Sequence, residues 1–242
     1  MVVNSPARLD VCTAGFEILL LRGVFEADTV EFLARNARNP FDLHPLCEQY
    51  VPGYGATTAD FHVIGDHPGV HGGLSTGVPF TDKEWSEQFF DALADGGLVE
   101  STALEERRIE SPETFFSYIH MCLPETVVPD RRSYDEMEPF FDAELRAITA
   151  HVLFPVGRRA TKHVFGNYTA IDPTDVTEMD DIHAEDRQGA GWLVMPIKDP
   201  GEWTGDDRDK LVSALETLLA SDYQQITDLG RFLPDEDPYF VR

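Results

Sequence analysis

Apolar residues gather in four short runs along the chain, each flanked by polar or turn-forming positions. Short apolar runs bounded in this way are typical of buried β-strands. Between and after them, apolar residues recur every three or four positions, which is the spacing of an amphipathic helix. The expected strands are residues 61–65, 115–121, 151–156 and 192–195, and the expected helices are residues 85–94, 134–150, 158–165 and 206–220.

The alternation of strands with helices predicts an α/β fold in which a parallel sheet is covered by helices on both faces. No internal repeat or low-complexity linker divides the chain, so we expect a single domain over residues 1–242. Its expected parts are an N-terminal helical extension (1–43, helical around 28–36), a core (44–220, with a polar surface excursion at 169–188) and a C-terminal tail (221–242).

The charge balance is the most unusual property of the chain. Of the 242 residues, 44 are acidic and 19 basic, which gives a formal net charge of -25. Hydrophobic residues still make up 42 %, so the chain has the means to build a core. An acidic surface poor in lysine is typical of a halophilic protein, because concentrated salt shortens the Debye length to roughly 3 Å. The alternative is simply an acidic protein. The negative charge disfavours nucleic acid as a partner but does not exclude a local basic site.

Two further patterns narrow the class of protein. The three cysteines are scattered without a CxxC pair, so neither a disulfide framework nor a four-cysteine zinc site is expected. The longest apolar run near the start, residues 18–21, is too short for a signal segment or a membrane span. We therefore expect a soluble, cytoplasmic protein with no membrane partner.

Turn-forming residues are densest directly after the first expected strand, over residues 65–73 and 76–81. Glycines and prolines there predict a tight loop whose backbone can approach a ligand closely. Phe80 follows a proline in this loop and is placed to offer a flat aromatic face. The GxGxxG and GxxxxGK[ST] patterns of dinucleotide and phosphate loops are absent from the sequence.

Five segments then carry a family resemblance: G-x-x-P-G at 65–69, G-x-P-F at 77–80, a strand ending in cysteine and proline at 118–124, a glycine opening a helix of small residues at 154–160, and P-x-x-D-P at 196–200. In this order and spacing the chain resembles the uracil-DNA glycosylase superfamily, particularly its prokaryotic branches that carry an iron–sulphur cluster. The resemblance covers residues 44–220, and the acidic composition favours a haloarchaeal member.

The resemblance implies a three-layer α/β/α sandwich around a four-stranded parallel sheet. It also implies a monofunctional DNA glycosylase of base excision repair, a hydrolase that removes a deaminated or damaged base from DNA. The implied partner is DNA, single-stranded or with the base flipped out, and the implied state is a monomer that needs no cofactor. Two alternatives are a non-catalytic module that binds a nucleobase or nucleic acid, and an acidic interaction protein with a vestigial pocket.

The expected catalytic residues are Asp66, His67 and Asp199, and all three depart from the family pattern. Asp66 matches a glutamate of the cluster-bearing branch, His67 an aspartate or asparagine of other branches, and Asp199 the histidine that hydrogen-bonds the leaving base. An ionised Asp199 beside a negative leaving base would cost roughly 4 kcal/mol at 4 Å. Either His67 donates to the base while Asp66 or Asp199 handles water, or His67 and Asp199 form a salt bridge in an inactive site.

The expected base-binding residues are Phe80, Tyr118 and His120. Phe80 would stack on a flipped base. Tyr118 replaces the asparagine that reads the uracil edge, and His120, two positions further along the same strand, faces the same way and can replace the missing amide. The alternative is that Phe80 and Tyr118 are ordinary core residues.

The expected phosphate-binding residues are His71, Lys198, Arg158 and Arg159. The two arginines open a helix, where backbone amides also favour anions. The alternatives are a solvated loop histidine and arginines paired with nearby acids.

The positions of the family's cluster ligands are His44, Cys47, Cys122 and Met137, which do not supply four thiolates. We therefore expect no iron–sulphur cluster, no other metal, and free buried cysteines. A zinc ion on His44, Cys47 and Cys122 is the alternative.

Overall fold

The computed structural model describes residues 37–103, 108–126 and 129–232. The helix expected around residues 28–36 lies outside the described residues. Within the described ranges, no helix is long and apolar enough to cross a membrane.

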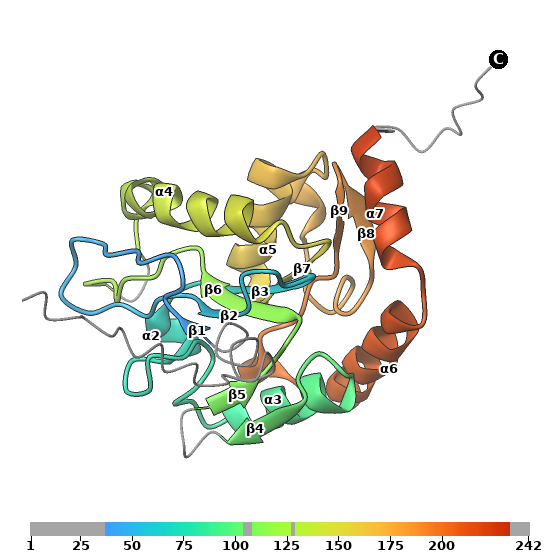
Figure 1. Ribbon diagram of the computed structural model, residues 1–242, viewed down its shortest axis with the longest axis horizontal. Helices are drawn as coiled ribbons and strands as arrows, with labels where there is room; N and C mark the ends of the chain where they lie inside the picture. The colour runs from blue at the N-terminus through green and yellow to red at the C-terminus, as the bar shows by residue number, and fades with distance from the viewer. Residues whose placement is uncertain (1–36, 104–107, 127–128, 233–242) are drawn as a thin grey trace, which may run out of the picture.

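A mixed sheet of seven strands forms the centre of the fold (Figure 1), in the order β1-β2-β6-β3-β7-β9-β8. The four middle strands, β6, β3, β7 and β9, run parallel, as the apolar runs predict. Strands β1, β2 and β8 pair antiparallel at the edges, and β4 and β5 form a separate antiparallel pair. The bounds are β1 Ala37–Arg38, β2 Tyr54–Gly55, β3 Phe61–Gly65, β4 Ser101–Ala103, β5 Arg108–Glu110, β6 Thr114–Tyr118, β7 Val152–Pro155, β8 Arg187–Gly189 and β9 Trp192–Val194.

Helices cover both faces of this sheet and complete the three-layer sandwich (Figure 1). Successive strand residues point to opposite faces, so Phe61 and Val63 of β3 pack towards α3 and α6, while Ile64 packs towards α4 and α5. The α/β expectation is therefore confirmed. The helix bounds are α2 Pro68–His71, α3 Ser86–Asp95, α4 Arg131–Ile148, α5 Gly157–Tyr168, α6 Asp207–Leu219 and α7 Tyr223–Phe232, with 3-10 turns at Pro173–Asp175 and Pro200–Glu202.

The stretch 169–188 is not the simple surface excursion that its polarity predicts. Val176, Met179 and Ile182 are buried against the α4–α5 side of the core, and the stretch leads into edge strand β8. These apolar residues stand singly among acidic ones, so they show no helical or strand periodicity in the sequence. Residues 223–232, within the expected tail, form α7, which packs against β8 and β9.

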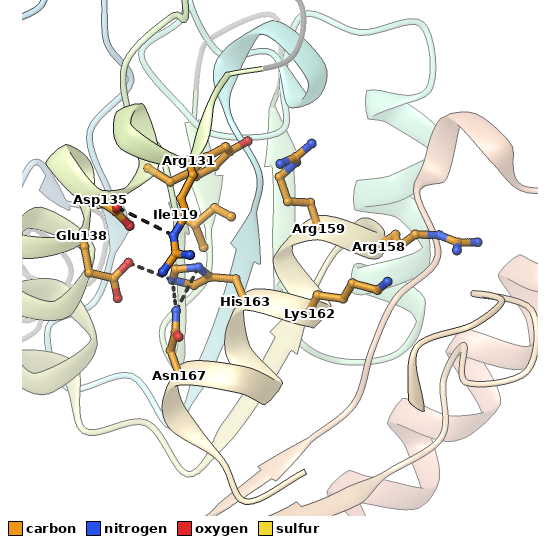
Figure 2. A pocket seen from close by; sticks show the side chains of 10 residues that line it. Ile119, Arg131, Asp135, Glu138, Arg158, Arg159, Lys162, His163 and Asn167 are labelled. Carbon is orange, nitrogen blue, oxygen red and sulfur yellow. Dashed lines mark hydrogen bonds and ion pairs between the residues drawn. The ribbon is translucent and has the colours of Figure 1, made fainter. Parts of the chain in front are cut away.

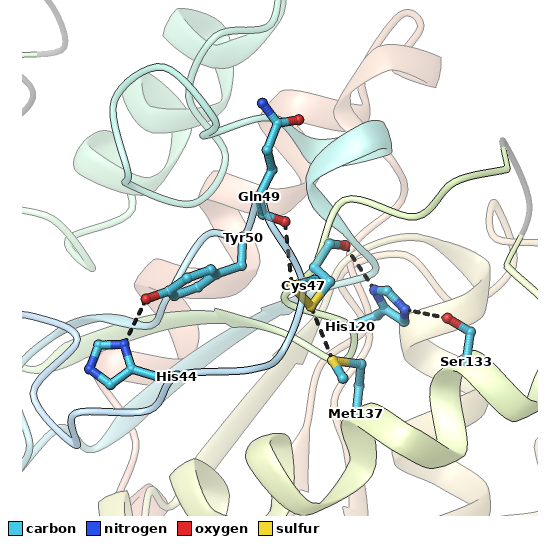
Figure 3. The surroundings of a disulfide bond; sticks show 8 residues. His44, Cys47, Gln49, Tyr50, His120, Ser133 and Met137 are labelled. Atoms are coloured by element: carbon cyan, nitrogen blue, oxygen red, sulfur yellow. Dashed lines mark hydrogen bonds between the residues drawn. A yellow bond between two sulfur atoms is a disulfide. The ribbon is translucent and has the colours of Figure 1, made fainter.

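A disulfide joins Cys47 to Cys122 (Figure 3), so the expectation of free cysteines is wrong for this pair. The two Cα atoms lie 6.1 Å apart, within the usual range for a disulfide. The sequence does not show this proximity because 75 positions separate the cysteines; the chain before β2 folds back beside the end of β6, where Tyr50 bridges to Cys122. Met137 Sδ lies 3.4 Å from Cys122 Sγ.

The same region bears on the metal alternatives. The two ring nitrogens of His44 bond Tyr50 and Asp42 at 2.8 Å each, and not the sulfur atoms of Cys47, Cys122 and Met137. Both thiols that the zinc alternative needs are used in the disulfide. Within the part of the chain that the structure describes, no group of three or more His, Cys, Asp or Glu side chains is arranged to hold a metal ion.

Candidate active site

The loops that follow β3, β6, β7 and β9 meet at the carboxyl end of the parallel sheet, where ligands bind in open α/β folds. The backbone N–H of His120 donates to the carbonyl of Asp66, which joins the first two loops at 3.0 Å. The N–H of Gly157 donates to the carbonyl of Ile197 at 2.8 Å, which joins the last two. The family motifs of four separate segments therefore border one region.

The first loop is tightly folded around α2. His67 is the N-cap of this short helix, because its Nδ1 accepts the N–H of Gly69 at 3.1 Å. Gly72 and Gly73 leave the helix with φ of +83° and +91°, and a Cβ at Gly72 would lie 1.8 Å from the carbonyl oxygen of Thr81. Only glycine fits here, so the loop holds the side chains of His67 and His71 in fixed positions.

Asp66 is a buried residue whose carboxylate lies close to three side chains: a tyrosine hydroxyl, an arginine and a histidine. Tyr134 Oη donates to its Oδ1 at 2.5 Å, and Arg159 Nε lies 3.4 Å from its Oδ2. His67 Nε2 lies 4.0 Å from the same oxygen. Burial and the bond to Asp66 raise the pKa of the Tyr134 phenol, so it remains a proton donor at neutral pH. The carboxylate is thus fixed in orientation from both sides.

His67 does not reach Asp199. Burial lowers its pKa to about 4, against the opposing charge of Asp66, so its imidazole is neutral at pH 7. Because Nδ1 accepts from Gly69, the proton of the neutral ring resides on Nε2, facing Asp66. The alternative of a salt bridge between His67 and Asp199 therefore names the wrong histidine.

His71 is the partner of Asp199. Its Nδ1 accepts the backbone N–H of Asp66 at 2.9 Å, so its Nε2 carries the proton and donates to Asp199 Oδ2 at 3.2 Å. Burial opposes ionisation of Asp199, but the hydrogen bond from His71 Nε2 and the N–H of Gly201 hold the pKa of this carboxyl below its usual value. An expected phosphate ligand is thus one member of a histidine–aspartate pair, in which the His71 side chain is 1 % exposed and that of Asp199 is 23 % exposed.

Tyr118 fills the space beside Phe80. Its hydroxyl accepts the N–H of Phe80 at 2.7 Å and lies 3.0 Å from the carbonyl of His71 and 3.1 Å from that of Gly72. Phe80 has no exposed surface, and its ring centroid lies 5.4 Å from that of Tyr118 and 5.4 Å from that of His71. Both residues are packed in the core, as the alternative states, and the Phe80 ring is covered by neighbouring rings that include those of Tyr118 and His71.

His120 does not face the same way as Tyr118. Its ring packs against Tyr134, its Nδ1 bonds the carbonyl of Cys122 at 2.8 Å, and its Nε2 bonds Ser133 at 2.7 Å. The expectation assumed strand alternation, but β6 ends at Tyr118, so the alternation does not extend to His120.

The expected phosphate-binding cations have protein partners. Lys198 Nζ lies 2.5 Å from Asp180 and 2.9 Å from Asp207, and these bonds raise its pKa. Arg158 bonds the carbonyl of Thr177 and Glu178, and it keeps 47 % of its side chain exposed. The pairing alternative therefore holds for the two arginines: Arg158 pairs with Glu178 at 3.0 Å and Arg159 with Asp66 at 3.4 Å, while both keep part of the side chain exposed.

Sequence reasoning missed two members of the site. His71 stood in the glycine loop and was given only a phosphate role. Tyr134 entered the sequence interpretation only as the first residue of the expected helix 134–150. In the structure Asp130 caps that helix by accepting the N–H of Ser133, and Tyr134 lies in the first turn facing Asp66. No spacing in the sequence relates Tyr134 to Asp66, which lies 68 positions away.

Comparisons with known proteins show what this chain is similar to. A sequence model of the uracil DNA glycosylase superfamily matches residues 52–216, which include every loop described above. The type-5 uracil-DNA glycosylase of Mycobacterium leprae (strain TN) is 26 % identical over 155 residues, which are 60 % of this chain and 61 % of that protein. The chain thus spans less than two thirds of the length of this relative.

Proposed function

Because the chain belongs to the uracil-DNA glycosylase superfamily, we propose that it hydrolyses the N-glycosidic bond of a deaminated or damaged base in DNA, as a monofunctional glycosylase of base excision repair. The substrate is a strand that is single-stranded or has the base flipped out of the stack. The reaction needs only side chains and water.

Breaking this bond leaves positive charge on the sugar and negative charge on the departing base. The site therefore needs a carboxylate or activated water on the sugar side and a proton donor on the base side. Asp66 serves as the carboxylate, because Tyr134 and Arg159 hold it in one orientation. His67 has a positioning role, as its Nε2 faces Asp66 from the first loop.

The observation that carries the proposal is the pair of His71 and Asp199. A lone aspartate at position 199 would repel the departing base. In this chain His71 Nε2 lies 3.2 Å from Asp199 Oδ2 and places an N–H donor beside that carboxylate. The Nε2–H of His71 donates to Asp199 and so offsets part of the negative charge that the departing base would meet. The His71 ring also lies beside Phe80, the aromatic residue proposed to stack on the base.

The second candidate function is a non-catalytic module that binds a nucleobase or nucleic acid. It is favoured by Tyr118, whose hydroxyl closes the space beside Phe80 with bonds to three backbone groups. Under the first proposal the flipped base displaces Tyr118, whereas under the second nucleic acid binds at the rim and no bond is cut.

The test is an assay of base removal at high salt. Labelled oligonucleotides that contain uracil, hypoxanthine or xanthine are incubated with the protein and then treated with alkali, which cuts the strand at abasic sites. We expect scission by the wild-type protein and by Asp206→Asn, a control at an exposed residue that makes no side-chain cap. We expect Asp66→Asn to lose roughly 100-fold or more in rate. Binding without scission would favour the module instead.

A further inference from the structure

A cavity of about 830 Å³ is lined by α4 and α5, and one of its lining residues, Tyr134, donates to Asp66. Figure 2 shows Arg131 extending from α4 towards His163 and Asn167 of α5, with Arg159 and Lys162 along the same wall. The volume lies within the range of small-molecule sites and exceeds what a single inorganic anion needs. Its lining residues are Ile119, Arg131, Tyr134, Asp135, Glu138, Arg158, Arg159, Lys162, His163 and Asn167.

The charge of this cavity opposes that of the molecule. Four of its ten lining side chains are cationic and two are acidic, in a chain with a net charge of -25. Glu138 is already engaged by His163 at 3.0 Å and by the hydroxyl of Tyr168. The only ion pair of Arg131 in the described chain is a loose one with Asp135 at 3.9 Å, and its side chain is 94 % exposed.

Lys162 gives the clearest signal. In the described part of the chain it has no ion pair, although acidic residues outnumber basic ones by more than two to one. Other lysines are paired or bonded: Lys198 with two aspartates, Lys210 with Glu185, and Lys83 with the carbonyl of Gly69. A cation left free at the wall of a cavity is available to a ligand.

The cations also stand where they weaken their own helices. Helix α4 begins with Arg131 and Arg132, and in α5 Arg158 and Arg159 follow the first residue, Gly157. Neither helix has an acidic residue in its first turn. By contrast, α6 carries Asp207 and Asp209 there. A cation in the first turn opposes the helix dipole by about 0.3–1 kcal/mol. These cations therefore favour an anion in the cavity, although they destabilise the helices that carry them.

We propose that this cavity binds a phosphorylated nucleotide unit, separate from the base that enters beside Phe80. Arg131 and Lys162 contact the phosphate from opposite walls, and Arg159, stacked over Tyr134 at 5.1 Å, presents a planar cation to the sugar or base. The unit is either a neighbouring nucleotide of a bound strand or a free mononucleotide. The proposal does not depend on hydrolysis, so it can stand if base removal is not observed.

The test measures fluorescence anisotropy of a short labelled oligothymidylate without any damaged base, at low salt. Lys162→Glu and Arg131→Glu are each expected to raise the apparent Kd at least about tenfold, because each reverses one phosphate contact. The matched control is Lys210→Glu, the same charge change on α6 at the opposite face of the sheet, with an expected change below about twofold. Thermal unfolding confirms that each variant is folded.

Competition separates the two sources of the nucleotide. Displacement of the labelled strand by thymidine monophosphate but not by thymidine assigns the site to a free nucleotide, and displacement by unlabelled strand alone assigns it to DNA. Equal increases in the apparent Kd for all three charge reversals would overturn the proposal, because they would show that binding depends only on the net charge of the protein and not on contacts in this cavity. Failure of the wild-type protein to bind either the strand or the mononucleotide would overturn it as well.

Discussion

Single buried side chains decide how this site differs from the pattern of its family. The family resemblance predicts an asparagine at position 118 and a histidine at position 199, where this chain has Tyr118 and Asp199. Each of these two residues has a partner that the sequence could not identify. The hydroxyl of Tyr118 is held by the loop that carries Phe80, and Asp199 is held by His71. The residue types at the motif positions were read from the sequence, but their partners lie 38 and 128 positions away and become visible only in the fold.

A second buried residue, Glu144, makes stability depend on pH. It has no exposed surface, its Oε1 accepts the N–H of Gly53 at 3.2 Å, and burial raises its pKa to about 8 from an ordinary value of 4.5. Between these two values the folded state retains a proton that the unfolded state releases. The stabilisation from this group is therefore complete below about pH 4.5 and is lost as pH rises through about 8.

Glu144→Gln tests this dependence, because the amide keeps the shape and cannot ionise. We expect the variant to match the wild-type free energy of unfolding near pH 5 and to exceed it by up to about 4 kcal/mol near pH 8. Urea unfolding at both pH values measures the difference. The control is Glu216→Gln at an exposed position of α6. A constant difference between Glu144→Gln and wild type across this pH range would contradict the account.

At the scale of elements, the sequence predicted the parallel strands and most of the covering helices, because periodic apolar faces are properties of local sequence. The strand at residues 61–65 was placed at its observed bounds, and the last expected helix differs from α6 by one residue at each end. The antiparallel edge strands were missed, since each has only two or three residues and none carries a pattern. The disulfide was missed because it depends on how the chain before β2 folds back.

The Cys47–Cys122 disulfide joins the segment before β2 to the residues that follow β6, and we expect it to stabilise the fold. Closing a loop of 75 positions restricts the unfolded chain, which corresponds to about 2–4 kcal/mol for natural disulfides. We expect a reducing agent to lower the free energy of unfolding by that amount, measured by denaturant titration. The double variant Cys47→Ser/Cys122→Ser should already be lower and should not respond to the reductant. A wild-type protein that is insensitive to reduction would contradict the prediction.

At the scale of the whole molecule, the charge of -25 is the governing quantity. Repulsion among 44 acidic side chains destabilises the compact state, and salt screens exposed charges beyond the Debye length. We expect the midpoint of thermal unfolding to rise steadily between about 0.1 M and 1 M KCl. Glycerol, which does not screen charge, serves as the control. A midpoint that is unchanged or lower at molar KCl would contradict this expectation.

The central claim is that His71, held by Asp199, serves the departing base in a hydrolytic site. The most direct measurement is the single-turnover release of free base from uracil-, hypoxanthine- or xanthine-containing strands, followed by chromatography. The account predicts release by the wild-type protein and a loss of roughly 100-fold or more in His71→Ala, with a smaller loss in His67→Ala. Release at the wild-type rate by His71→Ala, or no free base from any of the three strands, would contradict it.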